Sequence, residues 1–355
     1  MNEETWEQRV IRTAASIPVL DKAAMNIAIE HLNNLTKPQG SLGKLEQIAI
    51  QLSGITGQLF TAMDRRAVVV MAADHGVCEE NVSAYPAEIT AQMVNNIASG
   101  GAAINVLARQ AGADVICVDI GVNGVVGHSA VMPRKIREGT ANIVHAPAME
   151  RDEAARALVV GIELAETLTD QGYALFATGE MGIGNTTASS AVASVLCSVD
   201  PVLVVGRGTG IDVTTQRHKI AIVEQAIQLH APDAGDPLDV LSKIGGLEIA
   251  GLAGLIIGAA AKQRPVVIDG FISSVAALAA VRIAPAAAAY LIPSHLSEER
   301  GHAKVLTALQ LSPFIQMDMR LGEGTGAALC FHLIEASQRI MREMATFSSA
   351  GVTRG

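Results

Sequence analysis

Aromatic residues and cysteines are scarce in this chain of 355 residues, and each scarcity excludes a class of protein. Aromatic side chains make up only 3% of the sequence, so the core must be built mainly from Ala, Val, Ile and Leu, with close approaches at some of the 33 glycines. The 4 cysteines lie far apart, without a CxxC pair or a Cys/His cluster at zinc spacing. They are typical of buried thiols in a reducing cytosol, so we expect a cytoplasmic protein and no metal site.

An excess of positive charge and a long apolar segment are also missing. The formal net charge is -9, from 26 Lys and Arg against 35 Asp and Glu, which argues against a nucleic-acid partner. The strongest membrane candidate, residues 249–261, is shorter than the ~20 residues that a span requires. It is better interpreted as a buried helix rich in Gly and Ala. The polar, acidic N-terminus lacks the pattern of a secretory signal. A small anionic substrate stays open, because backbone amides and one or two cations can hold a phosphate.

Short β-branched runs that end in Gly, Asp or Ser recur along the middle of the chain. Such runs are typical of parallel strands buried on both faces, and Ala-rich stretches of helical length lie between them. Their alternation predicts an α/β fold with a doubly wound, mainly parallel, Rossmann-like sheet, whose functional loops meet at the carboxyl ends of the strands. The expected strands are 68–72, 115–120, 175–178, 202–205, 266–268 and 290–292, and the expected helices include 88–110, 153–171 and 186–198.

The two ends of the chain show helical periodicity without strands. We therefore expect a large α/β domain over residues 61–324, and a small helical subdomain formed by residues 1–60 together with residues 325–355. No repeat, low-complexity tract or long linker interrupts the chain, so a fully separable second domain is not expected. In the C-terminal helix, the residues expected on one apolar face are Leu329, Leu333, Ala336, Ile340 and Met344.

A single carboxylate precedes the expected C-terminal helix. Glu323 lies between Gly322 and Gly324, and two glycines allow the backbone to fold closely around a ligand. The carboxylate would then face incoming substrate. The alternative is that Glu323 only complements the positive end of the helix, which would lower its pKa unless a closed pocket desolvates the carboxylate.

A glycine-rich segment follows the strand expected at 175–178. Glu180 and Gly182 lie in it, and Asn185 and Thr186 open a helix of small residues whose backbone amides could hold a phosphate. A capped turn without a ligand is the alternative. The glycine spacing fits neither the dinucleotide fingerprint nor a P-loop.

A second glycine-rich segment, residues 204–212, contains Gly206 and Gly208 and is followed by Lys219. Lys219 could neutralise a phosphate carried on this loop. As an isolated lysine on a helix, it could equally be a solvated charge.

The loop after the first expected strand carries polar and aromatic side chains. Asp74 and His75 are two candidate metal ligands without a third, so we favour a hydrogen-bonded structural pair. Ser83, Tyr85 and Gln92 could form the wall of a pocket for a planar ring, with Tyr85 able to stack, or they could serve ordinary loop and capping roles.

Strand ends later in the chain supply Asp269, Ser294 and His295. We interpret His295 as a structural histidine and not as a catalyst.

Eight of these segments, taken in order, closely resemble the family of nicotinate-nucleotide:dimethylbenzimidazole phosphoribosyltransferases, which act in cobalamin lower-ligand assembly. The GEMGIGNTT and RLGEG segments are highly specific in combination, and the resemblance runs over about residues 35–335. The segments are 35–49, 71–77, 82–94, 179–187, 239–252, 266–274, 290–295 and 319–328.

The resemblance implies a homodimeric enzyme without a cofactor or metal. Its reaction transfers phosphoribose from nicotinate mononucleotide to 5,6-dimethylbenzimidazole, with inversion at the anomeric carbon, and gives α-ribazole 5′-phosphate and nicotinate. By resemblance, Glu323 is the general base. The residues implied for the acceptor base are Ser83, Tyr85, Gln92, Leu321 and Gly322, and those for the nucleotide and its phosphate are Glu180, Gly182, Asn185, Thr186, Gly206, Gly208 and Lys219.

Two other functions remain as alternatives. An NAD(P) dehydrogenase would share the sheet, but it should show the dinucleotide glycine spacing with an acidic residue about 20 positions later, and the chain does not. A non-catalytic nucleotide-binding or regulatory protein would bind nicotinate mononucleotide without turnover.

Overall fold

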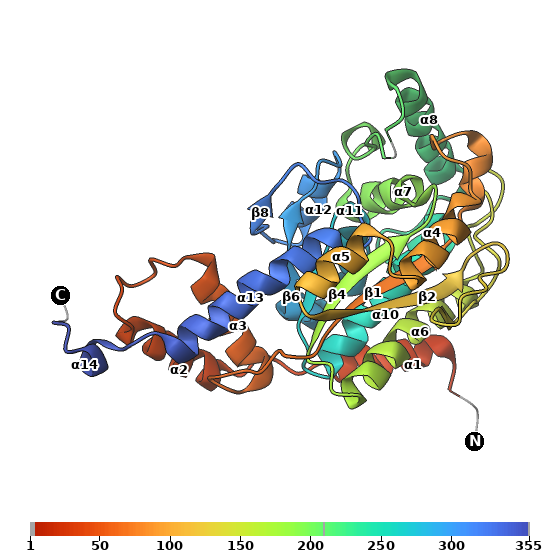
Figure 1. Cartoon of the computed structure of the whole chain (residues 1–355). Helices are drawn as coiled ribbons and strands as arrows, with labels where there is room; N and C mark the ends of the chain where they lie inside the picture. Colours follow the sequence, from red (N-terminus) through yellow and green to blue (C-terminus); the bar gives the residue numbers. More distant parts are fainter. Residues whose placement is uncertain (1–3, 209, 354–355) are drawn as a thin grey trace.

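The computed structural model describes residues 4–208 and 210–353, and a parallel sheet of six strands lies at its centre (Figure 1). The strand order β3-β2-β1-β4-β5-β6 is that of Rossmann-type sheets, in which later strands are added on both sides of the first. The predicted doubly wound α/β fold is therefore confirmed. The strands are β1 (Arg66–Ala73), β2 (Ala113–Gly121), β3 (Met132–Pro133), β4 (Leu175–Met181), β5 (Val266–Ile268) and β6 (Leu291–Pro293), with a separate parallel pair, β7 (His295–Leu296) and β8 (Ile315–Gln316).

Helices cover both faces of the sheet (Figure 1). The α-helices are α1 (Trp6–Ala15), α2 (Lys22–Asn34), α3 (Lys44–Thr56), α4 (Ile89–Ala98), α5 (Ala103–Gln110), α6 (Arg151–Asp170), α7 (Asn185–Cys197), α8 (Val213–His230), α9 (Pro237–Ile244), α10 (Leu247–Ala261), α11 (Phe271–Ile283), α12 (His302–Ala308), α13 (Thr325–Glu343) and α14 (Phe347–Ala350). The short 3-10 helices are η1 (Gly76–Glu80), η2 (Pro201–Leu203) and η3 (Pro285–Tyr290).

Strand β1 illustrates why the sheet needs helices on both sides. Successive side chains of a strand point to opposite faces, and all residues of β1 are buried. Val69 and Met71 belong to the core shared with α6 and α10, whereas Val68 and Val70 belong to the core shared with α4 and α13. Both faces are thus covered with apolar side chains, and the strand ends are left to carry the site.

Two helices beneath the sheet approach each other through glycines. A Cβ added to Gly161 of α6 would lie 2.0 Å from the carbonyl oxygen of Gly251, and one added to Gly254 of α10 would lie 1.9 Å from the carbonyl oxygen of Leu158. Only residues without a side chain allow this contact. The segment 249–261 is therefore a buried core helix, as predicted. None of the helices in the described ranges is long and apolar enough to cross a membrane.

Helices from the two end regions of the chain meet beside the sheet, where α2, α3 and the second half of α13 pack together (Figure 1). Their small core is separate from the cores of the sheet, and a single antiparallel bridge joins Leu35 to Thr346. We refer to α2, α3 and the second half of α13 as the terminal subdomain. Its core residues are Ala28, Leu32, Leu35, Ala49 and Met341.

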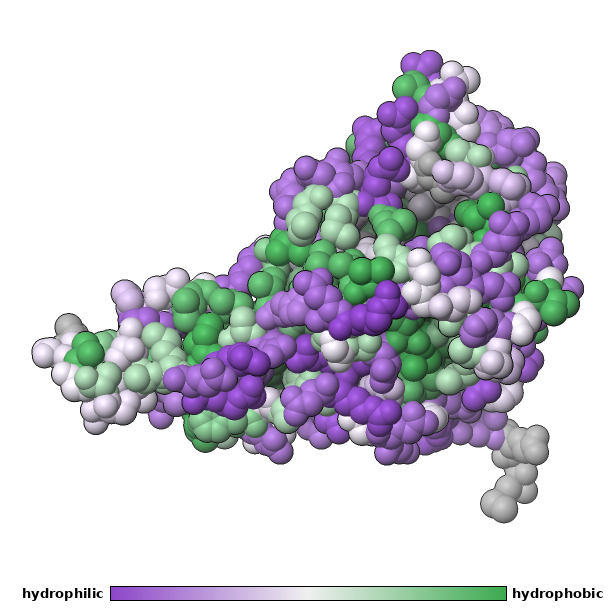
Figure 2. All heavy atoms as spheres, in the orientation of Figure 1, coloured by the Kyte–Doolittle hydropathy of each residue, from purple (hydrophilic) through white to green (hydrophobic). Residues whose placement is uncertain are grey.

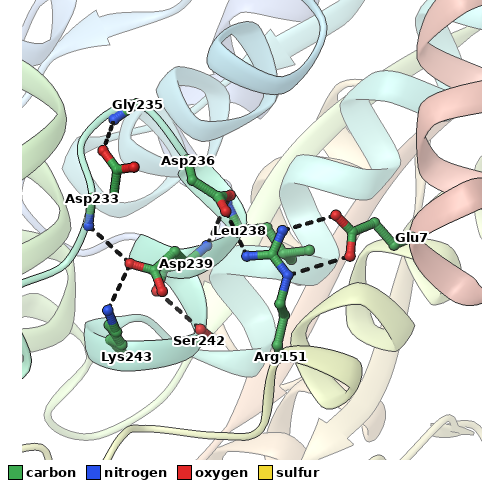
Figure 3. Close-up of polar contacts among 9 residues, drawn as sticks. All are labelled: Glu7, Arg151, Asp233, Gly235, Asp236, Leu238, Asp239, Ser242 and Lys243. Atoms are coloured by element: carbon green, nitrogen blue, oxygen red, sulfur yellow. Dashed lines mark hydrogen bonds and ion pairs between the residues drawn. The ribbon is translucent and has the colours of Figure 1, made fainter.

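Helix α1 lies outside this subdomain, contrary to the expectation that the subdomain contains all of residues 1–60. It packs on α6 and α10 of the large domain. Figure 3 shows Arg151, at the start of α6, between Glu7 of α1 and Asp236 before α9. Arg151 donates to Glu7 at 2.8 Å and to Asp236 at 2.6 Å. A short polar helix gave no sequence signal for this docking, because its partners lie more than 140 residues away.

Two predicted elements are wrong in detail. Residues 202–205 do not form a strand, because Pro201 lacks a backbone donor and the side chain of Asp200 caps Val202 N at 2.8 Å, which starts the short helix η2. The single helix expected at 88–110 is two helices, α4 and α5. It breaks at Gly100, which adopts a left-handed φ of 82°.

The buried face of α13 is also shifted from the predicted one. The five residues expected to face the core are only half-buried, while Ala327, Phe331 and Ile334 pack against the sheet. The helix contacts the sheet with its first half and the terminal subdomain with its second, so no single apolar stripe describes it. The space-filling view shows apolar residues gathered near the start of α13, whereas the end of the molecule formed by α8 is mostly hydrophilic (Figure 2).

Candidate active site

A pocket of about 700 Å³ opens at the carboxyl ends of β4 and β5. The first turns of α7 and α13 border it, together with the loop before α4. The pocket brings together ten of the thirteen predicted site residues, namely Ser83, Tyr85, Glu180, Gly182, Asn185, Thr186, Gly208, Leu321, Gly322 and Glu323.

Glu323 is held in an unusual backbone conformation. Its φ is 60°, between Gly322 at 85° and Gly324 at 87°, so three successive residues are left-handed. For a residue with a side chain this conformation costs about 1–3 kcal/mol and persists only where the surroundings enforce it. One close neighbour is Gly179 of β4, where an added Cβ would lie 2.6 Å from the carbonyl oxygen of Glu323.

The carboxyl group of Glu323 is buried in the pocket wall, with the residue only 5% exposed. Its Oε2 atom has no hydrogen-bond partner among the described residues. Burial raises the pKa of Glu323 above its ordinary value, and the nearby charge of Asp269 raises it further, against an opposing hydrogen bond from the backbone of Ile104. A carboxylate with a raised pKa and an unpaired oxygen is suited to accept a proton.

The start of α13 is capped by Asp269 and not by Glu323. The two carboxylate oxygens of Asp269 accept hydrogen bonds from Gly324 N at 3.1 Å and from Ala327 N at 3.0 Å. Asp269 therefore supplies the capping hydrogen bonds at the start of α13, and Glu323 is not needed to supply them. Asp269 follows β5 directly and also lines the pocket.

Glu180 lies beside this loop and joins it to the start of α7. Its Oε2 accepts a hydrogen bond from the amide of Asn185, and its Oε1 would lie 2.3 Å from a Cβ added to Gly322. Burial, followed by the charges of Glu248 and Asp269, raises the pKa of Glu180 to about 8. Glu180 is therefore mainly protonated at neutral pH.

We predict that Glu180 makes stability fall as the pH rises. The folded chain retains a proton on Glu180 up to about pH 8, whereas the unfolded chain releases it near the ordinary glutamate value. Between these values the free energy of unfolding should decrease by about 1.4 kcal/mol per pH unit because of this group. Glu180→Gln should remove that part of the slope in urea titrations across this range. Glu163→Gln, which alters an exposed carboxylate of α6, is the control. Identical slopes for wild type and Glu180→Gln would contradict the prediction.

Lys219 meets the glycine-rich loops inside the protein. It is only 1% exposed, and its Nζ donates to Thr186 Oγ1 at 2.6 Å. Burial lowers the pKa of Lys219 to about 8. The alternative of a solvated surface charge is therefore wrong. A Cβ added to Gly208 would lie 3.4 Å from this ammonium group, whereas Gly206 packs against Glu299, so Gly206 and Lys219 lie behind the wall of the pocket.

The wall nearest α4 is apolar. Ile89 and Met93, one helical turn apart, face the pocket together with Tyr85, which is 54% exposed at the rim. Gln92 is exposed on the outer side of α4 and is not among the lining residues. Gln92 was expected in the pocket wall, but the loop before α4 orients the helix so that Ile89 and Met93 face the pocket instead. The sequence alone did not fix that rotation.

The predicted pair of Asp74 and His75 is wrong. His75 Nε2 bonds Glu248 Oε1 of α10 at 2.8 Å, and Asp74 Oδ2 accepts from Asn123 N at 2.8 Å. Adjacent residues at a strand end point to opposite sides, so the two side chains diverge. Each side chain still makes a structural hydrogen bond, but with a different partner. No group of three or more His, Cys, Asp or Glu residues placed to hold a metal occurs in the described part of the chain.

Several lining residues were not among the predicted site residues. Asp269 and His295 follow strand ends, and this position was a usable signal for both. His295 Nδ1 lies 3.0 Å from Ser294 Oγ and 3.9 Å from Asp269 Oδ1. Glu299 and Arg320 reach the pocket from irregular segments without such a signal, and Arg320 donates to the carbonyl oxygen of Gly208 at 3.1 Å.

Comparisons with known proteins agree over nearly the whole chain. A family model described as Phosphoribosyltransferase matches residues 17–352. A nicotinate-nucleotide–dimethylbenzimidazole phosphoribosyltransferase of Halalkalibacterium halodurans is 51% identical over 346 residues, which covers 98% of this chain and 97% of the relative. A protein of the same name from Chloroflexus aggregans is 53% identical over 343 residues, covering 96% and 97% of the two chains.

A solved structure gives the same result for the fold. The crystal structure of the protein with this name from Thermus thermophilus superposes with a TM-score of 0.89 at 43% identity. The match covers 95% of this chain and 100% of the other.

Proposed function

Because the chain belongs to the nicotinate-nucleotide–dimethylbenzimidazole phosphoribosyltransferase family, we propose that it transfers phosphoribose from nicotinate mononucleotide to 5,6-dimethylbenzimidazole, with Glu323 as the general base. The products are α-ribazole 5′-phosphate and nicotinate. The observation that carries the proposal is the buried carboxyl group of Glu323 at the pocket wall, one oxygen of which has no hydrogen-bond partner in the part of the chain that the structure describes. Membership of this family removes the dehydrogenase alternative.

The proposed chemistry requires one base and no acid. Nicotinate mononucleotide carries a pyridinium on the ribose, so the ring departs neutral at nitrogen when the bond to the anomeric carbon breaks. One nitrogen of the azole attacks that carbon from the opposite side, which inverts it from β to α. Glu323 takes the proton from the other ring nitrogen. Much of the rate then comes from holding both rings across the anomeric carbon.

The pocket residues divide between the two substrates. The start of α7, which no side chain caps, offers backbone amides for the phosphate, and Lys219 lies behind this loop as a nearby cation. Glu180, Gly182, Asn185 and Gly208 complete the nucleotide side. The half opposite is apolar and suits a methyl-substituted aromatic ring, with Tyr85 placed to stack on it.

The test is direct. Purified protein is incubated with nicotinate mononucleotide and 5,6-dimethylbenzimidazole, and chromatography with mass detection measures α-ribazole 5′-phosphate. Formation of the product only when both substrates are present supports the proposal. Binding of the nucleotide by calorimetry without any product would favour the non-catalytic alternative instead.

The assembly state is proposed to be a homodimer. Size-exclusion chromatography with light scattering should give twice the chain mass of 36.9 kDa.

A further inference from the structure

The helix that follows Glu323 is capped from a distance. No side chain near Gly324 in the sequence caps α13. Instead, Asp269 reaches the helix start from the end of β5 and accepts Gly324 N and Ala327 N, which lie 55 and 58 residues later in the chain. Asp269 is only 2% exposed. The link between β5 and α13 is therefore a buried contact made by one carboxylate.

The hydrogen bonds of Asp269 determine whether the carboxylate of Glu323 is needed to cap α13. The first turn of a helix attracts negative charge, because its backbone amides lack partners and its dipole is positive there. Glu323 immediately precedes that turn and would satisfy it if the position were open. Since both oxygens of Asp269 already accept these amides, Oε2 of Glu323 is left unpaired at the pocket wall.

The same contact anchors the strained loop. Gly324 N is held by Asp269 on one side, and the backbone of Glu323 rests on Gly179 on the other. The left-handed conformation of Glu323 thus has two independent restraints. Loss of the bond to Asp269 removes one of them and exposes the helix start to Glu323 itself.

Most of the ionisable side chains near the loop are acidic. Both oxygens of Asp269 accept backbone donors, as expected of an ionised carboxylate, and its charge raises the pKa of both Glu180 and Glu323. His295 Nδ1 lies 3.9 Å from Asp269 Oδ1. Besides Tyr85 at the rim, the ionisable side chains that line the pocket with Glu323 are Glu180 from β4, Asp269 after β5, His295 from β7, Glu299 after β7 and Arg320 from the loop before α13. Glu248 of α10 also raises the pKa of Glu180.

We propose that Asp269 is a positioning residue: it occupies the amides at the start of α13 so that the carboxylate of Glu323 stays turned into the pocket. The inference rests on the proposed role of Glu323 as the base. Asp269 does not itself transfer a proton in this scheme. Its hydrogen bonds prevent the backbone amides at the start of α13 from binding the carboxylate of Glu323.

The test is Asp269→Asn, which keeps the shape of the side chain but removes its charge and one of its two acceptors. We expect a loss of kcat of about tenfold or more with a smaller change in KM. The acidic limb of the kcat/KM profile should move to lower pH, because a like charge near Glu323 is gone. Hydrogen exchange should become faster at the amides of residues 320–330.

The matched control is Asp119→Asn. Asp119 also lies near the end of a strand, is 6% exposed and caps the backbone by accepting Val122 N at 2.9 Å, but it does not line the pocket. Its substitution should leave the pH profile and the exchange of residues 320–330 as in wild type. If Asp269→Asn is too unstable to assay, Asp269→Ser supplies an uncharged capping group of smaller size.

Glu323→Gln, assayed in parallel, separates the two proposals. If Glu323→Gln is inactive while Asp269→Asn keeps the wild-type pH limb and exchange, the role of Asp269 is overturned and the base remains. If Glu323→Gln turns over normally, the base is overturned. Exchange at residues 320–330 then still judges the capping contact, which fails if Asp269→Asn leaves it unchanged.

Discussion

Glu323→Gln should lose about 10²-fold or more of kcat while it still binds nicotinate mononucleotide. Glutamine keeps the volume of the side chain and the left-handed backbone, but its amide does not accept the azole proton. The effect should be large because Glu323 is a pocket carboxyl group with a raised pKa and an oxygen unpaired within the described residues. Steady-state kinetics combined with calorimetry of nucleotide binding measures both quantities.

The pH dependence of kcat/KM provides a second test of the Glu323→Gln variant. The base must be ionised, so wild-type kcat/KM should rise with pH through the pKa of Glu323, and burial places this limb above the ordinary glutamate value. Glu323→Gln should lose this limb. The control is Glu298→Gln, which alters an exposed carboxyl group outside the pocket wall. Unchanged turnover in Glu323→Gln would remove the proposed role.

Gly179→Ala should abolish most activity without touching a substrate. The added Cβ would lie 2.6 Å from the carbonyl oxygen of Glu323 and 3.0 Å from Gly324 N, and both neighbours are backbone atoms that cannot rotate away. The loop must therefore shift, which should lower kcat by about 10²-fold. Overpacking should also reduce the free energy of unfolding by about 1–3 kcal/mol.

Gly127→Ala is the matched control for this substitution. No atom lies within 4 Å of a Cβ added there. We expect wild-type kinetics and an unchanged urea midpoint for Gly127→Ala. If Gly179→Ala were as active as Gly127→Ala, the close contact between β4 and the Glu323 loop would not be needed for catalysis.

The sheet could be predicted from the sequence because its signal is local. Buried parallel strands require continuous apolar runs, and five of the six expected runs became strands of the sheet. The expected run at 202–205 failed because a proline and a capping aspartate outweigh the β-branched residues beside them. Glu323 could be singled out for a similar reason, since its flanking glycines are visible in the sequence itself, but its expected role as the base came from the family resemblance.

The parts that escaped prediction depend on contacts between distant segments. The sequence shows that Lys219 is a lysine on a helix, but only the packing of α8 beside α7 places its ammonium group next to Thr186. The cap that Asp269 provides needs β5 and α13 side by side. Neighbouring residues of a helix point about 100° apart, and the apolar pattern of α4 did not decide whether Gln92 or Met93 faces the pocket.

Helix α13 begins at the carboxylate loop and ends among α2 and α3 of the terminal subdomain. With 19 residues it is a rod of roughly 28 Å. A small tilt imposed at its far end moves the near end by a distance that matters for proton transfer. Substitutions around Met341, which is remote from the pocket, should therefore change kcat at a smaller structural disturbance than the one that unfolds the protein. The helices of the terminal subdomain thus influence the position of Glu323.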